Sequence, residues 1–132
     1  DIGKLVLASA HPGESLSLAT ATGDGTAFER QRFGADHASL GALLAERWRF
    51  PPGICEAIRR HHEPDVPDTL ARIVTHADRL AHAFASPRPP ADTMQLCADA
   101  LVALGSRHTA PALFAELEQR AAAAADLVSA AT

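Results

Sequence analysis

The chain lacks most of the features that mark secreted, membrane or nucleic-acid-binding proteins. It has two cysteines, Cys55 and Cys97, no tyrosine, no asparagine and a single tryptophan. Two cysteines 42 residues apart in helix-like surroundings favour buried reduced thiols over a disulfide framework. No apolar run approaches the roughly 20 residues of a membrane span, and no signal-peptide pattern is visible. We therefore expect a cytoplasmic protein with no membrane partner.

Positive charge is also scarce. The net charge is −4 with a pI near 5.9, which argues against a nucleic-acid partner because such partners need a clustered basic face. Eleven of the twelve basic residues are arginine, and with abundant alanine this indicates a GC-rich bacterial genome. The length of 132 residues and 47% hydrophobic content predict one globular domain over residues 1–132, which would bury roughly two-thirds of its unfolded surface.

The pattern of apolar residues is helical throughout. No segment alternates apolar and polar residues as a strand does, so the sequence predicts an all-α domain. Helices are expected over residues 1–10, 27 to about 34, 37–48, from Pro51-Pro52 to His61, from Asp68 to about Phe84, from Asp92 to near Gly105, and from Thr109 onward. Residues 12–25 are polar and predict at most a weak helix, and residues 86–90 predict a proline-rich loop.

Capping residues set several of these boundaries. We expect Asp36 and Asp68 to cap the helices that follow them, and Gly34 to end the helix before it. Thr26-x-x-Glu29 and Asp92-x-x-Gln95 have the spacing of capping boxes. The side chains expected to face inward on the successive helices are Leu40, Leu43, Leu44, Trp48, Ile54, Ala57, Ile58, Leu70, Ile73, Val74, Ala77, Leu80, Ala81, Phe84, Leu113, Phe114, Leu117, Ala121, Ala124 and Val128.

Carboxylates and imidazoles recur at wide spacing, each inside a segment predicted to be helical. This arrangement is typical of a metal site built between the helices of a bundle. The four stretches are Asp1-Ile2-Gly3-Lys4, Asp36-His37, His61-His62-Glu63 and Ala77-Asp78-Arg79-Leu80.

Each candidate also has an ordinary structural explanation. Asp78 falls at the edge of an apolar stripe, where a carboxylate must bind a metal or be paired, for example with an arginine. His61 and His62 can bind metal or interact with the carbonyls and dipole of a helix end. His11, His76, His82 and His108 carry less weight, because they lie in loops or on the flanks of the stripe.

The first two stretches leave similar alternatives open. Gly41 lies one turn after His37, and a glycine inside a helix suggests either close approach of another group or a packed helix crossing. Asp1 and Lys4 share a helix face and can present an oxygen ligand and a phosphate-binding cation, or can simply be exposed. Arg79 can reach a phosphate near Asp78 or belong to a solvated face.

These stretches resemble a known family. Asp1-Ile-Gly-Lys-Leu resembles the second half of the His-Asp motif of the HD superfamily of metal-dependent phosphohydrolases. Three further stretches resemble the HDOD branch of that superfamily. They are Phe33-Gly-Ala-Asp-His-Ala-Ser-Leu-Gly41, Ile58-Arg-Arg-His-His-Glu-Pro64 and Leu70-Ala-Arg-Ile-Val-Thr-His-Ala-Asp-Arg-Leu-Ala81. The resemblance runs to about residue 128 and includes Leu101-Val-Ala-Leu-Gly105.

The resemblance implies that the chain is the C-terminal portion of an HD-type helical bundle. It also implies a metal site whose ligands are Asp1, His37, His61, His62 and Asp78. It implies a divalent Fe, Mn or Zn ion, with Lys4 and Arg79 neutralising phosphate charge. The family's histidine before Asp1 and its N-terminal helices are absent, so we expect an exposed apolar face and self-association. HDOD domains are mostly bacterial signalling or output modules that act through other signalling domains or proteins.

Three functions follow as hypotheses. The first is a non-catalytic signal-transduction module that acts through protein partners. The second is a metal-dependent phosphohydrolase acting on a nucleotide or another phosphoester, and the third is a helical scaffold with no site. Hydrolysis of cyclic-di-GMP is not expected, because His61-His62-Glu63 leads into Pro64-Asp65-Val66-Pro67 instead of the Gly-Tyr-Pro stretch of HD-GYP enzymes.

Overall fold

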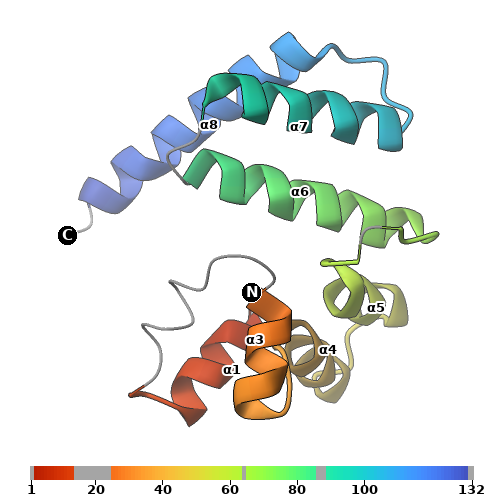
Figure 1. Ribbon diagram of the computed structural model, residues 1–132, viewed down its shortest axis with the longest axis vertical. Helices are drawn as coiled ribbons and strands as arrows, with labels where there is room; N and C mark the ends of the chain where they lie inside the picture. The colour runs from red at the N-terminus through yellow and green to blue at the C-terminus, as the bar shows by residue number, and fades with distance from the viewer. Residues whose placement is uncertain (1, 14–24, 64, 86–88, 131–132) are drawn as a thin grey trace. The chain divides into compact units, whose positions relative to one another are not determined.

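The computed structural model describes residues 2–13, 25–63, 65–85 and 89–130 (Figure 1). Regular structure in these ranges is helical with no strand, which confirms the all-α prediction. None of these helices combines the length and apolarity needed to cross a bilayer. The weak helix considered for residues 12–25 falls largely outside the described residues. The helices are α1 (Ile2–Ala10), α3 (Gly25–Phe33), α4 (His37–Arg47), α5 (Pro52–Arg60), α6 (Thr69–Ala85), α7 (Pro90–Ala103) and α8 (Ala110–Ala130).

The chain divides into two compact units. The first unit is Asp1–Thr75 and the second unit is His76–Thr132, so the boundary falls inside α6. Each unit is described separately below. The expectation of a single domain over the whole chain stays a prediction.

Local side-chain chemistry sets most helix ends where the sequence predicts them. Asp36 caps α4 by accepting the Ser39 N–H at 2.7 Å. Asp68 accepts the Ala71 N–H at 2.9 Å at the start of α6. Gly34 follows the end of α3 with φ +78°, a left-handed conformation that glycine adopts without a steric penalty. These three predictions are confirmed.

The two predicted capping boxes are wrong. α3 begins at Gly25, so Thr26 lies inside the helix, where its hydroxyl accepts a hydrogen bond from Arg30 at 2.9 Å. α7 begins at Pro90, two residues before Asp92, because proline is well suited to a first helical turn. The Gln95 side chain donates to Asp99 at 2.8 Å instead of reaching back to the helix start.

The crossing of α1 and α4 depends on two glycines. A Cβ added at Gly3 would overlap the carbonyl of His37 and lie 2.9 Å from the Gly41 nitrogen. A Cβ added at Gly41 would lie 3.3 Å from the Gly3 nitrogen and 3.2 Å from the Ile58 side chain. The two helix backbones are therefore in direct contact. Gly41 thus lies at a packed helix crossing, the second of the two explanations considered for it.

The buried hydrophobic residues of the first unit are mostly small. They are Leu7, Ala38, Ala42, Ala45, Cys55, Ala57, Val66 and Ala71. Small residues let helix backbones approach closely, and they bury little apolar area per residue. Both cysteines are free and buried, as predicted. The first unit therefore combines close helix contacts with a modest hydrophobic core.

Several residues predicted to face inward are exposed. Leu43 is 61% exposed and Trp48 is 53% exposed, because α4 turns its alanine face, which includes Ala42 and Ala45, toward its neighbours. Trp48 follows the last helical residue of α4 and so leaves that face. On α6, Leu70 and Ile73 are exposed, as are Ala77 and Ala81, while Ala71 and Thr75 are buried. The prediction that Trp48 is a core anchor is wrong.

The second unit has its own apolar core. α7 and α8 pack together, and Leu80, Cys97 and Ala100 form the buried centre of this unit (Figure 1). The side chains packed around that centre are Leu96, Ala110, Leu113, Phe114 and Leu117. Three of the predicted inward residues of the last helix are thereby confirmed. Ala124 is exposed instead, and the side chain of Val128 lies outside the described residues.

We expect Gly3→Ala to destabilise the first unit, because its new Cβ meets backbone atoms that no rotamer change can move away. Overpacking of this kind costs about 1–3 kcal/mol or more, measured by urea unfolding followed by circular dichroism. Gly53→Ala is the matched control, since its Cβ would lie 4.0 Å from the nearest atom, and it should be neutral or stabilise by up to about 1 kcal/mol. Equal effects of the two substitutions would contradict the close-contact explanation.

Candidate metal centre

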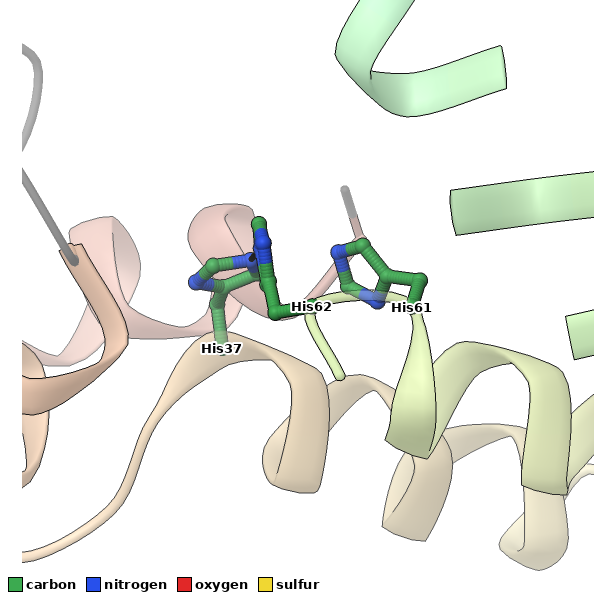
Figure 2. Close-up of side chains that lie close together, drawn as sticks. All are labelled: His37, His61 and His62. Atoms are coloured by element: carbon green, nitrogen blue, oxygen red, sulfur yellow. Dashed lines mark hydrogen bonds between the residues drawn. The ribbon is translucent and has the colours of Figure 1, made fainter. Parts of the chain in front are cut away.

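Three histidines converge where α4 begins and α5 ends (Figure 2). His37 is the first residue of α4, and His61 and His62 directly follow α5. One nitrogen from each ring lies within 4.8 Å of the others, and the Nε2 atoms of His37 and His62 are 2.8 Å apart. His37 and His61 are buried, whereas His62 is exposed. The cluster therefore has two fixed rings and one ring open to solvent.

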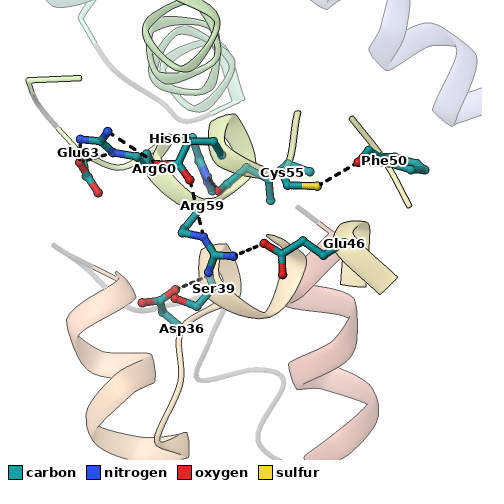
Figure 3. A network of polar contacts seen from close by, with 11 residues as sticks. Asp36, Ser39, Glu46, Phe50, Cys55, Arg59, Arg60, His61 and Glu63 are labelled. Carbon is teal, nitrogen blue, oxygen red and sulfur yellow. Dashed lines mark hydrogen bonds and ion pairs between the residues drawn. The ribbon is translucent and has the colours of Figure 1, made fainter. Parts of the chain in front are cut away.

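Polar contacts hold the end of α5 against α4 (Figure 3). Arg59 on α5 donates to Glu46 on α4 at 2.6 Å. Arg60 donates to Glu63 at 2.8 Å, just beyond the two histidines. The Cys55 thiol lies 3.6 Å from the carbonyl of Phe50 in the connection between the helices. These contacts fix the position of the α5 terminus that carries His61 and His62.

The buried carboxylate of Glu29 holds His37. One oxygen, Oε2, lies 2.6 Å from Nδ1 of the His37 ring and also accepts the His37 backbone N–H at 2.8 Å. Glu29 is 2% exposed and His37 is 3% exposed. A carboxylate can only accept, so the proton of the neutral ring resides on Nδ1 and the lone pair on Nε2. Nε2 is the nitrogen that faces His62.

His61 is held in a similar way. Its Nδ1 lies 2.7 Å from the carbonyl oxygen of Ile58, an acceptor, so Nδ1 donates and Nε2 carries the lone pair. Metal-binding histidines commonly have this arrangement, in which an oxygen acceptor orients the ring through the nitrogen that does not bind the metal. The helix-end interaction considered from the sequence is thus also present at His61.

Electrostatics favour the neutral form of His37. Burial is the main cause that lowers the pKa of His37 below its ordinary value of 6.5. The hydrogen bond and negative charge of Glu29 act in the opposite direction, while the positive charge of Lys4 on α1 lowers this pKa further. A neutral imidazole is the form that binds a metal ion. Lys4 therefore lies close enough to influence the cluster.

The donor set is compatible with one transition-metal ion. Metal–nitrogen bonds of about 2.0–2.1 Å place two adjacent ligands about 3.0–3.4 Å apart and opposite ligands at most about 4.2 Å apart. The 2.8 Å between the Nε2 atoms of His37 and His62 is close to the distance expected for adjacent ligands. The three ligand nitrogens lie within 4.8 Å of one another, so a small ring movement would bring them to one ion. The ring centroids of His37 and His61 are 5.3 Å apart, the widest of the three pairs, so these two rings would have to approach each other. His37, His61 and His62 would hold the ion.

The site roles of the remaining predicted residues Asp1, Asp78 and Arg79 stay predictions. Asp1 lies outside the described residues. Asp78 and Arg79 belong to the second unit, and their roles as ligand and phosphate contact stay predictions. The Asp78 side chain is 18% exposed and lies 3.3 Å from His82. A histidine is thus a described neighbour of this carboxylate, and the arginine pairing considered from the sequence stays a prediction.

Sequence reasoning missed Glu29. We interpreted it as half of a capping box with Thr26, whereas its carboxylate contacts His37 eight residues later. No local periodicity links these two positions, because a loop between α3 and α4 separates them. The only available signal was an acidic residue a short distance before the Asp-His pair.

Comparison with known proteins gives a family match over the first part of the chain. Residues 1–64 match the model of the HDOD domain. This stretch is therefore similar to an HDOD domain. It contains Lys4, Glu29 and all three histidines of the cluster. No curated protein is significantly similar to the sequence.

A solved structure shares the fold. It is described as a "putative phosphohydrolase" from Shewanella amazonensis SB2B and superposes with a TM-score of 0.66 at 24% identity. The match covers 89% of this chain and 46% of that chain, so this chain spans about half the length of its structural neighbour. The predicted HD-superfamily helical bundle is thereby confirmed as the fold.

The lowered pKa of His37 predicts an acid-sensitive fold. The unfolded chain takes up a proton at His37 near pH 6.5, whereas the folded chain takes it up only at lower pH. Stability without metal should thus be full above pH 6.5 and fall as the pH drops through the folded-state pKa. We expect His37→Gln to lose less unfolding free energy than the unaltered chain between pH 7.5 and 5.5, as measured by urea titration at each pH. Identical losses in both proteins would show that His37 is not responsible.

Proposed function

We propose that this HDOD domain is a non-catalytic module of a bacterial cytoplasmic signalling protein, that it binds one divalent transition-metal ion, and that it acts through protein partners. The ion is Zn, Fe or Mn, held by His37, His61 and His62. It would connect the start of α4 to the end of α5. Regulation would then depend on the arrangement of these helices.

The convergence of the three imidazoles is the observation that carries this proposal. They come from two helices, two of them are buried, and both buried rings are oriented by oxygen acceptors through Nδ1. Imidazole is a preferred ligand of Zn, Fe and similar ions. The core of the first unit is built largely from alanine, so a metal that connects two of its helices would add stability.

Exposed aromatic side chains support action through protein partners. Trp48 is 53% exposed and Phe50 is 45% exposed, and their rings lie 6.2 Å apart at the end of α4. Aromatic residues are enriched in protein–protein interfaces, where they supply large contact area. This pair, with the neighbouring exposed Ile54, is the surface through which we expect another protein or a second copy to bind.

Phosphoester hydrolysis is the second candidate. Lys4 places a positive charge near His37, and the exposed His62 gives solvent access to the cluster. The structural neighbour is described as a "putative phosphohydrolase", which is consistent with this candidate. A bound divalent ion supplies Lewis acidity toward a phosphoester, while Lys4 would bind the phosphate charge. Asp1, Asp78 and Arg79 remain candidates for the same chemistry.

The first test is metal binding. Protein purified without chelator or an affinity-tag metal should contain close to one equivalent of metal by mass spectrometry. We expect His62→Ala to lose most of it without unfolding, because His62 is exposed. His108→Ala, an exposed histidine in the second unit, is the control and should retain it. Metal well below one equivalent in the unaltered chain would contradict the proposed metal centre.

The same metal-loaded samples separate the two candidate functions. The non-catalytic proposal predicts no turnover of p-nitrophenyl phosphate or bis-p-nitrophenyl phosphate. Turnover that requires metal and is lost in both His62→Ala and Lys4→Ala would establish the phosphohydrolase instead.

The aromatic surface predicts concentration-dependent association. Sedimentation velocity should show self-association of the unaltered chain and a larger monomer fraction for Trp48→Glu, because a charge opposes burial of this surface. Val102→Glu introduces the same charge at a residue that is 82% exposed and lies in the second unit. If both substitutions change association equally, general charge repulsion is responsible and the aromatic surface is not specific.

A further inference from the structure

We propose that Glu29 is the positioning residue of this metal centre, holding His37 in the one tautomer and orientation that directs Nε2 toward His62. The inference rests on the proposed metal binding for its consequence. The geometry that supports it is the pair of contacts between Glu29 and His37. Glu29 itself does not need to touch the metal for this role.

A single oxygen of Glu29 fixes both the ring and the backbone of His37. Oε2 lies 2.6 Å from the ring Nδ1 and 2.8 Å from the backbone nitrogen of the same residue. The two contacts close a small cycle through the side chain of His37 and so restrict rotation about both of its side-chain torsions. Both residues are almost fully buried, and water therefore competes little for these bonds. These contacts fix the orientation of the ring.

Helix capping alone does not account for this contact. Asp36 already caps α4 by accepting the Ser39 N–H, so the helix start has a capping group without Glu29. Burying a second carboxylate is costly unless it is well paired. The additional bond to the ring offsets that cost. It also gives Glu29 a role that Asp36 does not have.

A carboxylate is better suited to this role than an amide. It has no N–H or O–H to donate when ionised, so it accepts only a protonated Nδ1 and leaves the Nε2 lone pair available. A glutamine could instead turn its NH₂ toward the ring and stabilise the opposite tautomer. The Ile58 carbonyl imposes the same condition on His61. His62, the exposed ring, is the third ligand of the proposed set.

The experiment compares Glu29→Gln with the unaltered chain by two readouts. Zinc affinity is measured by competition with a chromogenic chelator, and the His37 tautomer is measured in metal-free protein by long-range ¹H–¹⁵N correlation spectra. We expect the unaltered chain to show a protonated Nδ1. We expect Glu29→Gln to populate the Nε2-protonated form and to bind zinc about 10–100-fold more weakly, as is typical when a group that orients a ligand is removed.

Asp36→Ala is the matched control for the helix start. It removes the cap of α4 and should lower thermal stability while retaining the His37 tautomer and most of the zinc affinity. Equal losses of affinity in Asp36→Ala and Glu29→Gln would overturn the proposal, because they would reduce Glu29 to a capping role. Unchanged affinity and tautomer in Glu29→Gln would overturn it directly.

Two further outcomes are distinguishable. If Glu29→Gln fails to fold, Glu29→Asp replaces it, since a shorter carboxylate should keep the tautomer while weakening zinc binding. Loss of the tautomer in Glu29→Asp would count against the proposal. If the unaltered chain binds no zinc, the proposed metal centre fails, whereas the tautomer measurement still decides whether Glu29 positions His37.

Discussion

The arrangement of the first unit depends on the buried pair of Glu29 and His37. A carboxylate removed from water is costly, and here it is offset by two hydrogen bonds from one residue. Its position at the start of α4 adds a favourable interaction with the helix dipole. The same pair holds the first residue of α4 and sets which tautomer His37 adopts and which nitrogen faces His62. Local structure and the chemistry of the candidate site therefore share one interaction.

Close backbone contact brings the pieces of that site together. Gly3 allows α1 to touch the backbone of His37, and Gly41 continues the contact one turn later. The alanine face of α4 admits its neighbours equally closely. Lys4 follows Gly3 directly, so the same crossing places its charge near His37. Small residues thus perform two functions, packing the helices and positioning a cation beside the imidazoles.

The surface of the first unit contrasts with its small-residue interior. Large apolar side chains, including Leu43, Trp48 and Phe50, lie outside, while alanine fills much of the inside. A helix that must approach another backbone cannot place leucine or tryptophan at the contact, so these residues are displaced to other faces. Such displaced residues supply the apolar area that a binding partner can use. The interior packing and the proposed interaction surface are in this sense two consequences of one constraint.

The sequence by itself determined the helical class and most helix ends, because the hydrophobic period and the Asp and Gly caps depend on residues close together in the chain. The HDOD resemblance, carried by short motifs, pointed to the three histidines. Only the tertiary structure decided which helix faces are buried, since a close crossing at Gly3 and Gly41 overrides the ordinary preference for large apolar residues inside. It also decided the role of Glu29. That residue matched a local capping pattern, but its partner His37 lies beyond a loop. The periodicity of a sequence does not predict a contact across a loop.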